Sequence, residues 1–419
     1  MSAFPLPASP PLKVIAAALR RTTERLAREL AQPTDSQPQW NETEWAIAGA
    51  AAAMQGISVL LARRLLWCGP PSWRDFLTEQ QEQGTLRHAA IGAVLERLDA
   101  VLRAGGVGCV ALKGAALRGL DIYSIGERPM GDIDLLVRSV DLPSTAAAMA
   151  KIDYVEAYTS QRHRVYAPRR KVAPRSLGEH VDNPLKIEIH TVVAEALPVR
   201  RIDITARLWP DTVAPGLNAY SDLWALLLHL LLHAAGSMRA HALRQIQLHD
   251  IATIAPLLSS AQWAKLLESQ RDRGGPWWVL PPLELAARYY PGRVPAEVLH
   301  AAGNACPRLL RVATERQSLT DVSWSNLHIH AFPGIAWSRT PLDVLRFARS
   351  RVVPSRHALT ELQFALADQP QLEQVPWYGM AHGRRVLRWL FSRPPRVQTM
   401  VCVLAALESS RVGSTKGGG

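Results

Sequence analysis

Two short apolar runs of the chain carry acidic side chains at a spacing that could bring them together in an active site. Asp132 and Asp134 stand one residue apart in Asp-Ile-Asp-Leu-Leu-Val, and Glu188 and His190 stand one residue apart in Lys-Ile-Glu-Ile-His. Because alternate residues of a β-strand point to the same face, each pair is expected to project together. The two aspartates repel each other unless a cation binds between them, or unless the stretch is a loop in which both are solvated.

Metal-dependent transfer of a phosphoryl or nucleotidyl group requires residues of this kind. The protein must supply carboxylates for Mg²⁺, donors for the polyphosphate and a group near the attacking hydroxyl. Mg²⁺ commonly takes one or two carboxylates together with substrate phosphates, which Asp132 and Asp134 would provide. Glu188 is a candidate third acid, because burying an unpaired carboxylate in so apolar a strand is costly.

A lysine-glycine pair precedes these acids. The run Gly-Val-Gly-Cys-Val-Ala-Leu-Lys-Gly predicts a strand that ends at Lys113 and Gly114, and residues 115–124 predict a helix directly after it. The N-terminus of a helix in this position favours anions. Alternatively, Lys113 simply extends its ammonium group from the start of the helix into solvent.

The elements around these runs differ in their periodicity. Apolar residues recur at helical spacing before Gly105-Gly106, with Asn41 as an expected N-terminal helix cap, and again after the α/β segment. The expected regions are helical residues 1–104, an α/β core at 105–216, helical residues 217–411 and a flexible tail at 412–419.

Composition and cysteine usage limit the class of protein. With 48% hydrophobic and 20% charged residues, the 419-residue chain is expected to fold. Its cysteines are far apart, which argues against a disulfide framework or a cysteine zinc site and fits a reducing cytoplasm. The N-terminus lacks the pattern of a signal peptide, and the most apolar run, residues 223–236, is too short for a membrane span. His229 and His233 within that run have zinc-ligand spacing but lack the adjacent glutamate, so histidines of the core are favoured.

The formal charge of +12 comes largely from arginine. Arginine suits bidentate contacts with phosphate, so nucleotides, nucleic acid or an acidic substrate are plausible partners. An arginine- and alanine-rich composition is also typical of genomes with high GC content. Because the sequence shows no basic stripe interleaved with stacking aromatics, nucleic acid is the less favoured partner.

The run from Val110 to Met149, followed by Ile-Glu-Ile-His, resembles the nucleotidyltransferase family related to DNA polymerase β. More narrowly, it is similar to a bacterial branch of uncharacterised nucleotidyltransferases, which shows Lys-Gly, then Arg, then Asp-x-Asp, then an acid-x-His strand. Arg244 and Asp250 resemble a later Arg…Asp segment of that branch, and residues 345–363 are similar to its C-terminal region. The resemblance is specific over 110–193 and looser over 224–410.

The resemblance implies an α+β fold, in which a small mixed β-sheet core is flanked by N-terminal and C-terminal helical regions. It also implies roles for the acids: Asp132 and Asp134 would hold the metals, and Glu188 would help to bind the metal that activates the acceptor hydroxyl, or would act as its base. The third acid is glutamate here, where the wider superfamily more often has aspartate.

The same resemblance suggests which residues hold the nucleotide. The candidates are Lys113, Gly114, Arg128, His190 and Arg244. Lys113 and Gly114 stand where the wider superfamily has a Gly-Ser pair that cradles the triphosphate, so the mode of phosphate binding differs. Arg128 could instead pair with Glu127 or Asp132, and His190 could orient Glu188 or hydrogen-bond the backbone.

The expected activity is a cytoplasmic, Mg²⁺- or Mn²⁺-dependent transfer of a nucleoside monophosphate from a nucleoside triphosphate. AMP from ATP is the simplest case, and the acceptor would be a hydroxyl or phosphate of a small molecule or peptide. Kinase-like phosphoryl transfer, an RNA-modifying role and a non-catalytic nucleotide-binding module are the alternatives. A binding module has no need of Glu188, which favours an enzyme.

Overall fold

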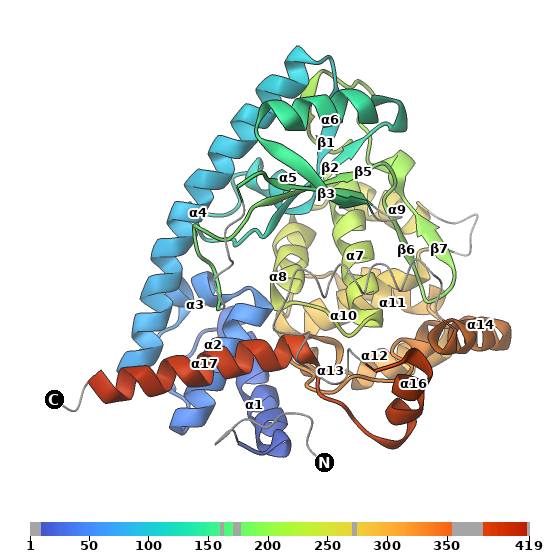
Figure 1. Ribbon diagram of the computed structural model, residues 1–419. Coiled ribbons are helices and arrows are strands. Elements are labelled where there is room, and N and C mark those ends of the chain that lie inside the picture. Colours follow the sequence, from blue (N-terminus) through green and yellow to red (C-terminus); the bar gives the residue numbers. More distant parts are fainter. Residues whose placement is uncertain (1–9, 160–162, 171–176, 270–274, 354–379, 417–419) are drawn as a thin grey trace.

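A computed structural model describes residues 10–159, 163–170, 177–269, 275–353 and 380–416 of the chain (Figure 1). Residues 354–363 of the segment that resembles the C-terminal region of the nucleotidyltransferases lie outside the described residues, as do residues 417–419 of the expected tail.

A mixed six-stranded sheet forms the α/β part of the protein, which confirms the predicted α+β fold. Its strand order is β3-β4-β5-β2-β1-β8. Strand β2 pairs in parallel with β5, β1 pairs in parallel with β8, and the other neighbours are antiparallel. The strands are β1 (Gly108–Ala111), β2 (Asp132–Val137), β3 (Tyr154–Thr159), β4 (His163–Pro168), β5 (Lys186–His190) and β8 (Gly216–Asn218). A separate two-stranded sheet consists of β6 (Ala194–Ala196) and β7 (Arg201–Asp203).

The two faces of the large sheet belong to different hydrophobic clusters. Ile133, Leu135 and Val137 of β2 face a cluster that includes residues of α4 (Pro71–Ala104) and α6 (Leu142–Lys151). Leu136 of β2 belongs instead to the cluster around α7 (Leu223–Arg239). In Figure 1, α6 lies above the sheet and α7 below it. Because strand residues alternate, the side chains of Asp132 and Asp134 share the α7 face with Leu136.

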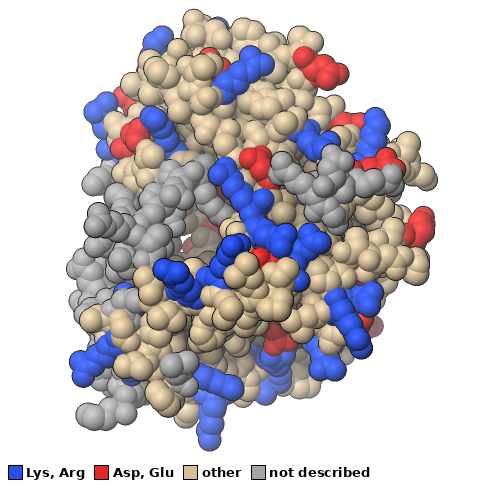
Figure 2. All heavy atoms as spheres, turned by 90° about the vertical axis from the view of Figure 1, so that its right-hand side faces the viewer, with Lys and Arg blue, Asp and Glu red and all other residues tan. Residues whose placement is uncertain are grey.

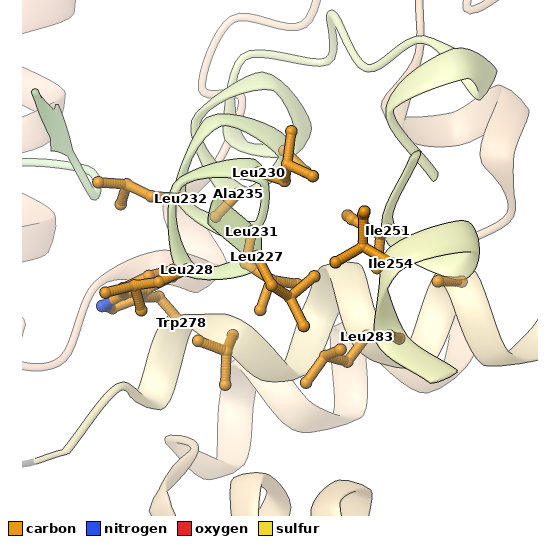
Figure 3. Packing of buried hydrophobic residues seen from close by; sticks show 14 of the residues in the cluster. Leu227, Leu228, Leu230, Leu231, Leu232, Ala235, Ile251, Ile254, Trp278 and Leu283 are labelled. Atoms are coloured by element: carbon orange, nitrogen blue, oxygen red, sulfur yellow. The ribbon is translucent and has the colours of Figure 1, made fainter. Parts of the chain in front are cut away.

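Helix α7 is apolar on nearly all sides because it is packed on nearly all sides. Figure 3 shows its leucines between α8 (Gln245–Ile254) and α10 (Leu280–Tyr289), where Ile251, Ile254 and Leu283 contact the same cluster. Trp278, which is fully buried, packs in this cluster too. A helix buried in this way needs no polar face, so the apolar run at 223–236 is a core helix.

The N-terminal region is helical, as predicted. It consists of α1 (Leu12–Ala31), α2 (Glu42–Gln55), α3 (Ser58–Arg64) and α4. Asn41 caps α2 as expected, since its side chain accepts from the Glu44 N–H and the Glu44 carboxylate accepts from the Asn41 N–H, each at 3.0 Å. Gly56, with a φ of 67°, ends α2, and α3 leaves at a bend of 113°. None of the described helices is by itself long and apolar enough to cross a bilayer, although the bent pair α2–α3 has the required length and composition.

The C-terminal region is also helical, and its last helix returns to the N-terminal helices. Besides α7, α8 and α10, it contains α9 (Ser260–Glu268), α11 (Ala296–Ala305), α12 (Arg308–Arg316), α13 (Leu319–Val322), α14 (Pro341–Val352), α16 (His382–Phe391) and α17 (Val397–Lys416). Met400 and Val403 of α17 pack with Ile15 and Ile47 of α1 and α2. Helix α17 continues to Lys416, so residues 412–416 of the expected tail are helical. The flexibility of this tail stays a prediction.

Candidate active site

The register of two neighbouring strands brings the predicted acids together. Because β2 and β5 are parallel, Asp134 lies opposite Glu188, and Leu136 lies opposite His190. The intervening residues Ile187 and Ile189 are buried on the other face, whereas Glu188 and His190 are half-buried on the face of the acids. The alternation expected from the sequence is therefore what places a carboxylate of each strand side by side.

Lys113 reaches this group of acids from the end of β1. Its φ of 46° is unusual for a residue with a side chain, and the chain turns there from β1 into α5 (Lys113–Arg118). The Lys113 ammonium lies 2.8 Å from Asp134 Oδ1. Its backbone N–H donates to the Tyr220 hydroxyl at 3.1 Å. One N–H at the start of this six-residue helix is therefore already bonded within the protein, and anion binding there stays a prediction.

Gly114 allows the loop before β2 to pack closely against α5. A Cβ at this position would lie 2.6 Å from Met130 Sδ and 2.7 Å from Arg128 Nη1. Only a residue without a side chain lets the loop before β2 approach α5 so closely. Its expected part in binding the triphosphate stays a prediction.

Asp134 is the most strongly held of the acids. It is buried, and its Oδ1 accepts from the Lys113 ammonium at 2.8 Å and lies 2.9 Å from His190 Nε2. Burial alone would raise the pKa of Asp134, but the Lys113 charge and the His190 hydrogen bond hold that pKa well below its ordinary value. Asp134 therefore stays ionised.

The pKa of Asp132 is shifted in the opposite direction. Burial, followed by the negative charges of Asp134 and Glu188, raises the pKa of Asp132 to about 7. Lys113 opposes this shift only in part. The group thus carries more negative charge than its lysine neutralises, which is the state that a bound cation would relieve.

The closest contact of His190 is with neither of the two partners that the sequence suggested, Glu188 and the backbone. Its closest partner is Asp134, whereas Glu188 Oε2 lies 3.7 Å from His190 Nε2. Burial lowers the pKa of His190, but the hydrogen bond to Asp134 and the nearby Glu188 carboxylate outweigh burial and raise it. The sequence could not indicate this partner, because Asp134 is on another strand, 56 residues earlier.

His163 is a site residue that the sequence did not reveal. It lies on β4 directly opposite His190, and the two ring centroids are 5.0 Å apart. His163 Nε2 lies 3.7 Å from Glu188 Oε2. Nothing in the surrounding run His-Arg-Val-Tyr-Ala-Pro marks this histidine, since its position depends on how β4 pairs with β5.

A cavity of about 310 Å³ opens beside these residues. Asp132, Glu188, Lys113 and the two histidines form one wall, and residues of α7 such as His233 and Gly236 form the other. A Cβ at Gly236 would lie 2.6 Å from Glu195 Cδ, so glycine lets the chain after β5 pack against α7. Figure 2 shows Lys and Arg side chains gathered near the centre of one face of the molecule. Such a concentration of positive charge favours the approach of anionic substrates.

His229 is part of the core, as predicted. Its Nδ1 lies 2.7 Å from the Tyr220 hydroxyl, which in turn receives the Lys113 N–H. Burial, followed by the charge of Lys113, holds the pKa of His229 well below its ordinary value. The neutral imidazole thus supports the backbone of Lys113 through Tyr220.

The two arginines assigned to the nucleotide contact other parts of the protein. Arg128 forms a bidentate pair with Asp250, at 2.8 Å and 2.6 Å, and its third nitrogen donates to the Pro129 carbonyl. The alternative partners Glu127 and Asp132 were wrong, and Glu127 pairs with Arg64 instead. Arg244 Nε donates to the Met54 carbonyl at 3.0 Å. Neither arginine lines the 310 Å³ cavity; nucleotide binding by Arg244 stays a prediction.

Comparison with known proteins gives one match. A family model described as an uncharacterised nucleotidyltransferase matches residues 41–291, which include all strands, the cavity and the helices from α2 to α10. No curated protein and no solved structure matches the chain. The matched region extends further toward the N-terminus than the resemblance at 110–193, and it ends well before residues 345–363.

Proposed function

Since the chain belongs to the uncharacterised nucleotidyltransferase family, we propose that it transfers a nucleoside monophosphate from a nucleoside triphosphate to a hydroxyl or phosphate acceptor. AMP from ATP is the simplest case, the acceptor is a small molecule or peptide, and the place is the cytoplasm. The observation that supports this proposal most directly is the convergence of Asp132, Asp134 and Glu188 on one face of two parallel strands.

The residues fit a hard divalent cation. Carboxylate oxygens are the ligands that Mg²⁺ and Mn²⁺ prefer, and burial together with the negative charges of Asp134 and Glu188 raises the pKa of Asp132. Asp132 and Asp134 would hold the ion. When bound, the ion would offset the charge of the triphosphate and of the leaving pyrophosphate.

The other groups act on the substrates. In the transfer, the acceptor oxygen bonds to the α-phosphorus, the bond from that phosphorus to the bridging oxygen breaks, and pyrophosphate leaves. Glu188, half-buried in the cavity wall, is available to take the proton of the acceptor hydroxyl or to bind a metal that acidifies that hydroxyl. Lys113, in the same wall, adds a positive charge for the triphosphate.

Calorimetry and a transfer screen test the proposal. We expect ATP to bind measurably with Mg²⁺ or Mn²⁺ and at least about tenfold more weakly with chelator, because the acids repel a bare triphosphate. ATP, GTP, CTP and UTP are then incubated with acceptor pools, and products are identified by mass. A nucleoside monophosphate on the acceptor supports the proposal, whereas a single phosphoryl group identifies a kinase. Equal affinity with metal and with chelator contradicts the proposed metal site.

Lys113 provides a second test, because its ammonium forms an ion pair with Asp134 at 2.8 Å. We expect Lys113→Met to lower the free energy of unfolding by about 1–3 kcal/mol in chelator, since Asp134 loses its charged partner. Mg²⁺ should restore much of that loss by binding the native carboxylates. Urea denaturation with and without Mg²⁺ measures both, with the exposed Lys265→Met as the control. An identical loss in both conditions would show that the cation does not use Asp134.

A further inference from the structure

Beside the aspartate pair lies a second group of potential ligands, this one containing nitrogen. His163 and His190 are direct neighbours across the β4–β5 pairing, and Glu188 precedes His190 by two residues on the same strand. The pairing register therefore projects all three side chains from one face of the sheet. Each is half-buried, and each lines the 310 Å³ cavity.

The ligand atoms of this group are close enough to share one ion. Glu188 Oε2 lies 3.7 Å from His163 Nε2 and 3.7 Å from His190 Nε2. One ligand atom from each residue lies within 4.8 Å of the others. A tetrahedral ion with bonds of about 2.0–2.2 Å separates its ligand atoms by roughly 3.3–3.6 Å. Only small side-chain movements are needed to reach that separation, and an ion bound by His190 Nε2 would replace the contact of that nitrogen with Asp134 Oδ1.

We infer that His163, Glu188 and His190 form a site for a divalent transition-metal ion, such as Zn²⁺, Mn²⁺ or Co²⁺. Imidazole nitrogen with one carboxylate suits these ions, whereas Mg²⁺ favours oxygen ligands. Three protein ligands leave a coordination position for water or an acceptor oxygen, which the adjoining cavity has room to admit.

The site adjoins the proposed magnesium site without duplicating it. His190 Nε2 lies 2.9 Å from Asp134 Oδ1, so the histidines lie directly beside the aspartate pair. Two metals that share carboxylates are a common arrangement for activating an attacking oxygen and a phosphoryl group together. The catalytic use of the transition metal rests on the proposed function. Its binding does not, because the three ligands are present whether or not a nucleotide is transferred.

Cobalt is a suitable probe, because Co²⁺ bound by nitrogen and oxygen ligands absorbs visible light. The full chain is titrated with Co²⁺ in the absence of nucleotide, and Mg²⁺ is then added as competitor. Zn²⁺-loaded protein is examined by X-ray absorption to count imidazole ligands. We expect Co²⁺ to bind at least about tenfold more tightly than Mg²⁺, following the order of divalent-metal affinities, and we expect two imidazoles on zinc.

His163 is the residue to change, since it is remote from the aspartate pair in sequence and contributes no carboxylate. We expect His163→Gln to weaken Co²⁺ binding by about 100-fold or more, because changes outside the first coordination sphere already cost 10–100-fold. His163→Phe should weaken Co²⁺ binding to the same extent while preserving an aromatic ring in the cavity wall. His300→Gln, on the exposed surface of α11, is the matched control. Mg²⁺-dependent ATP binding should survive in the control variant His300→Gln.

Several outcomes decide whether His163, Glu188 and His190 bind a transition-metal ion. Equal Co²⁺ affinity in His163→Gln and His300→Gln overturns the inference, as does zinc bound by oxygen ligands alone. If both His163 variants fail to fold, the imidazole count on the unaltered protein still decides. Co²⁺ binding through two imidazoles without any ATP binding would support the metal site and remove the proposed transferase function.

Discussion

Asp132→Asn and Asp134→Asn are each expected to slow nucleotidyl transfer by on the order of 10³-fold, at nearly constant side-chain shape. Each substitution removes one negative charge from the group that would hold the metal, and charge stabilisation of this kind is usually the largest contribution to catalysis. Mg²⁺-dependent ATP binding should fall in parallel. Single-turnover transfer and calorimetry measure the two effects, with Glu156→Gln, an exposed acid of the same sheet, as the control.

The two aspartates should differ in their effect on stability. Burial and neighbouring acids raise the pKa of Asp132 to about 7, so its ionised form costs stability in the metal-free protein at higher pH. Asp132→Asn should therefore leave the free energy of unfolding unchanged or raise it at pH 8 in chelator. Lys113 and His190 hold the pKa of Asp134 well below its ordinary value, so its ionised form contributes stability. Asp134→Asn should lower the free energy of unfolding under the same conditions.

Glu188→Gln should separate binding from turnover. The aspartate pair would still hold the metal of the triphosphate, so ATP binding should survive, while transfer fails because the acceptor hydroxyl is no longer activated. Wild-type transfer rates in all three acid variants would contradict the nucleotidyltransferase assignment of these residues. Unfolding of all three would show that the acids serve only the structure.

Local periodicity predicted the strands that carry the acids. Asp132 and Asp134 alternate with Ile133 and Leu135, and Glu188 alternates with Ile187 and Ile189, so each sequence shows both the strand and its polar face. The N-terminal cap at Asn41 was equally visible, because a capping box needs residues only three apart. Features of this kind depend on neighbours in the chain.

Features that depend on pairing between distant segments could not be predicted. The register between β4 and β5 decides that His163 faces His190. Strand β8, only three residues long, forms because it pairs with β1 more than 100 residues earlier. The contact of the Lys113 ammonium with Asp134 depends on how β1 and β2 pair, so the run around Lys113 did not indicate it. In each case the partner lies in another element, and no local sequence pattern identifies it.

Arg128 and Asp250 form the strongest of these long-range pairs. Removing either partner should lower the free energy of unfolding. The guanidinium and carboxylate are 14% and 2% exposed, and the pair ties the loop before β2 to α8. Asp250→Leu alone should lower the free energy of unfolding by about 3–5 kcal/mol, because it leaves a buried guanidinium without its carboxylate. Arg128→Met alone should cost a similar amount. Urea denaturation at neutral pH measures each.

The double variant Arg128→Met/Asp250→Leu should recover most of that loss, since apolar side chains of similar volume often replace a buried ion pair at little cost. Tyr123 donates to Asp250 Oδ1, so every member of the cycle carries Tyr123→Phe. Arg201→Met, in an exposed pair, is the control and should change stability by at most about 0.5–1 kcal/mol. Additive losses in the cycle would contradict a coupled pair.

The same double variant decides whether Arg128 also binds the nucleotide. All three guanidinium nitrogens are already bonded within the protein, two to Asp250 and one to the Pro129 carbonyl. We therefore expect Mg²⁺-dependent ATP affinity in the folded double variant to match that of the Tyr123→Phe parent within about twofold, a difference of roughly 0.4 kcal/mol. A tenfold loss of affinity with stability intact would instead assign Arg128 to the triphosphate. Its pairing with Asp250 would then be an arrangement that gives way when the nucleotide binds.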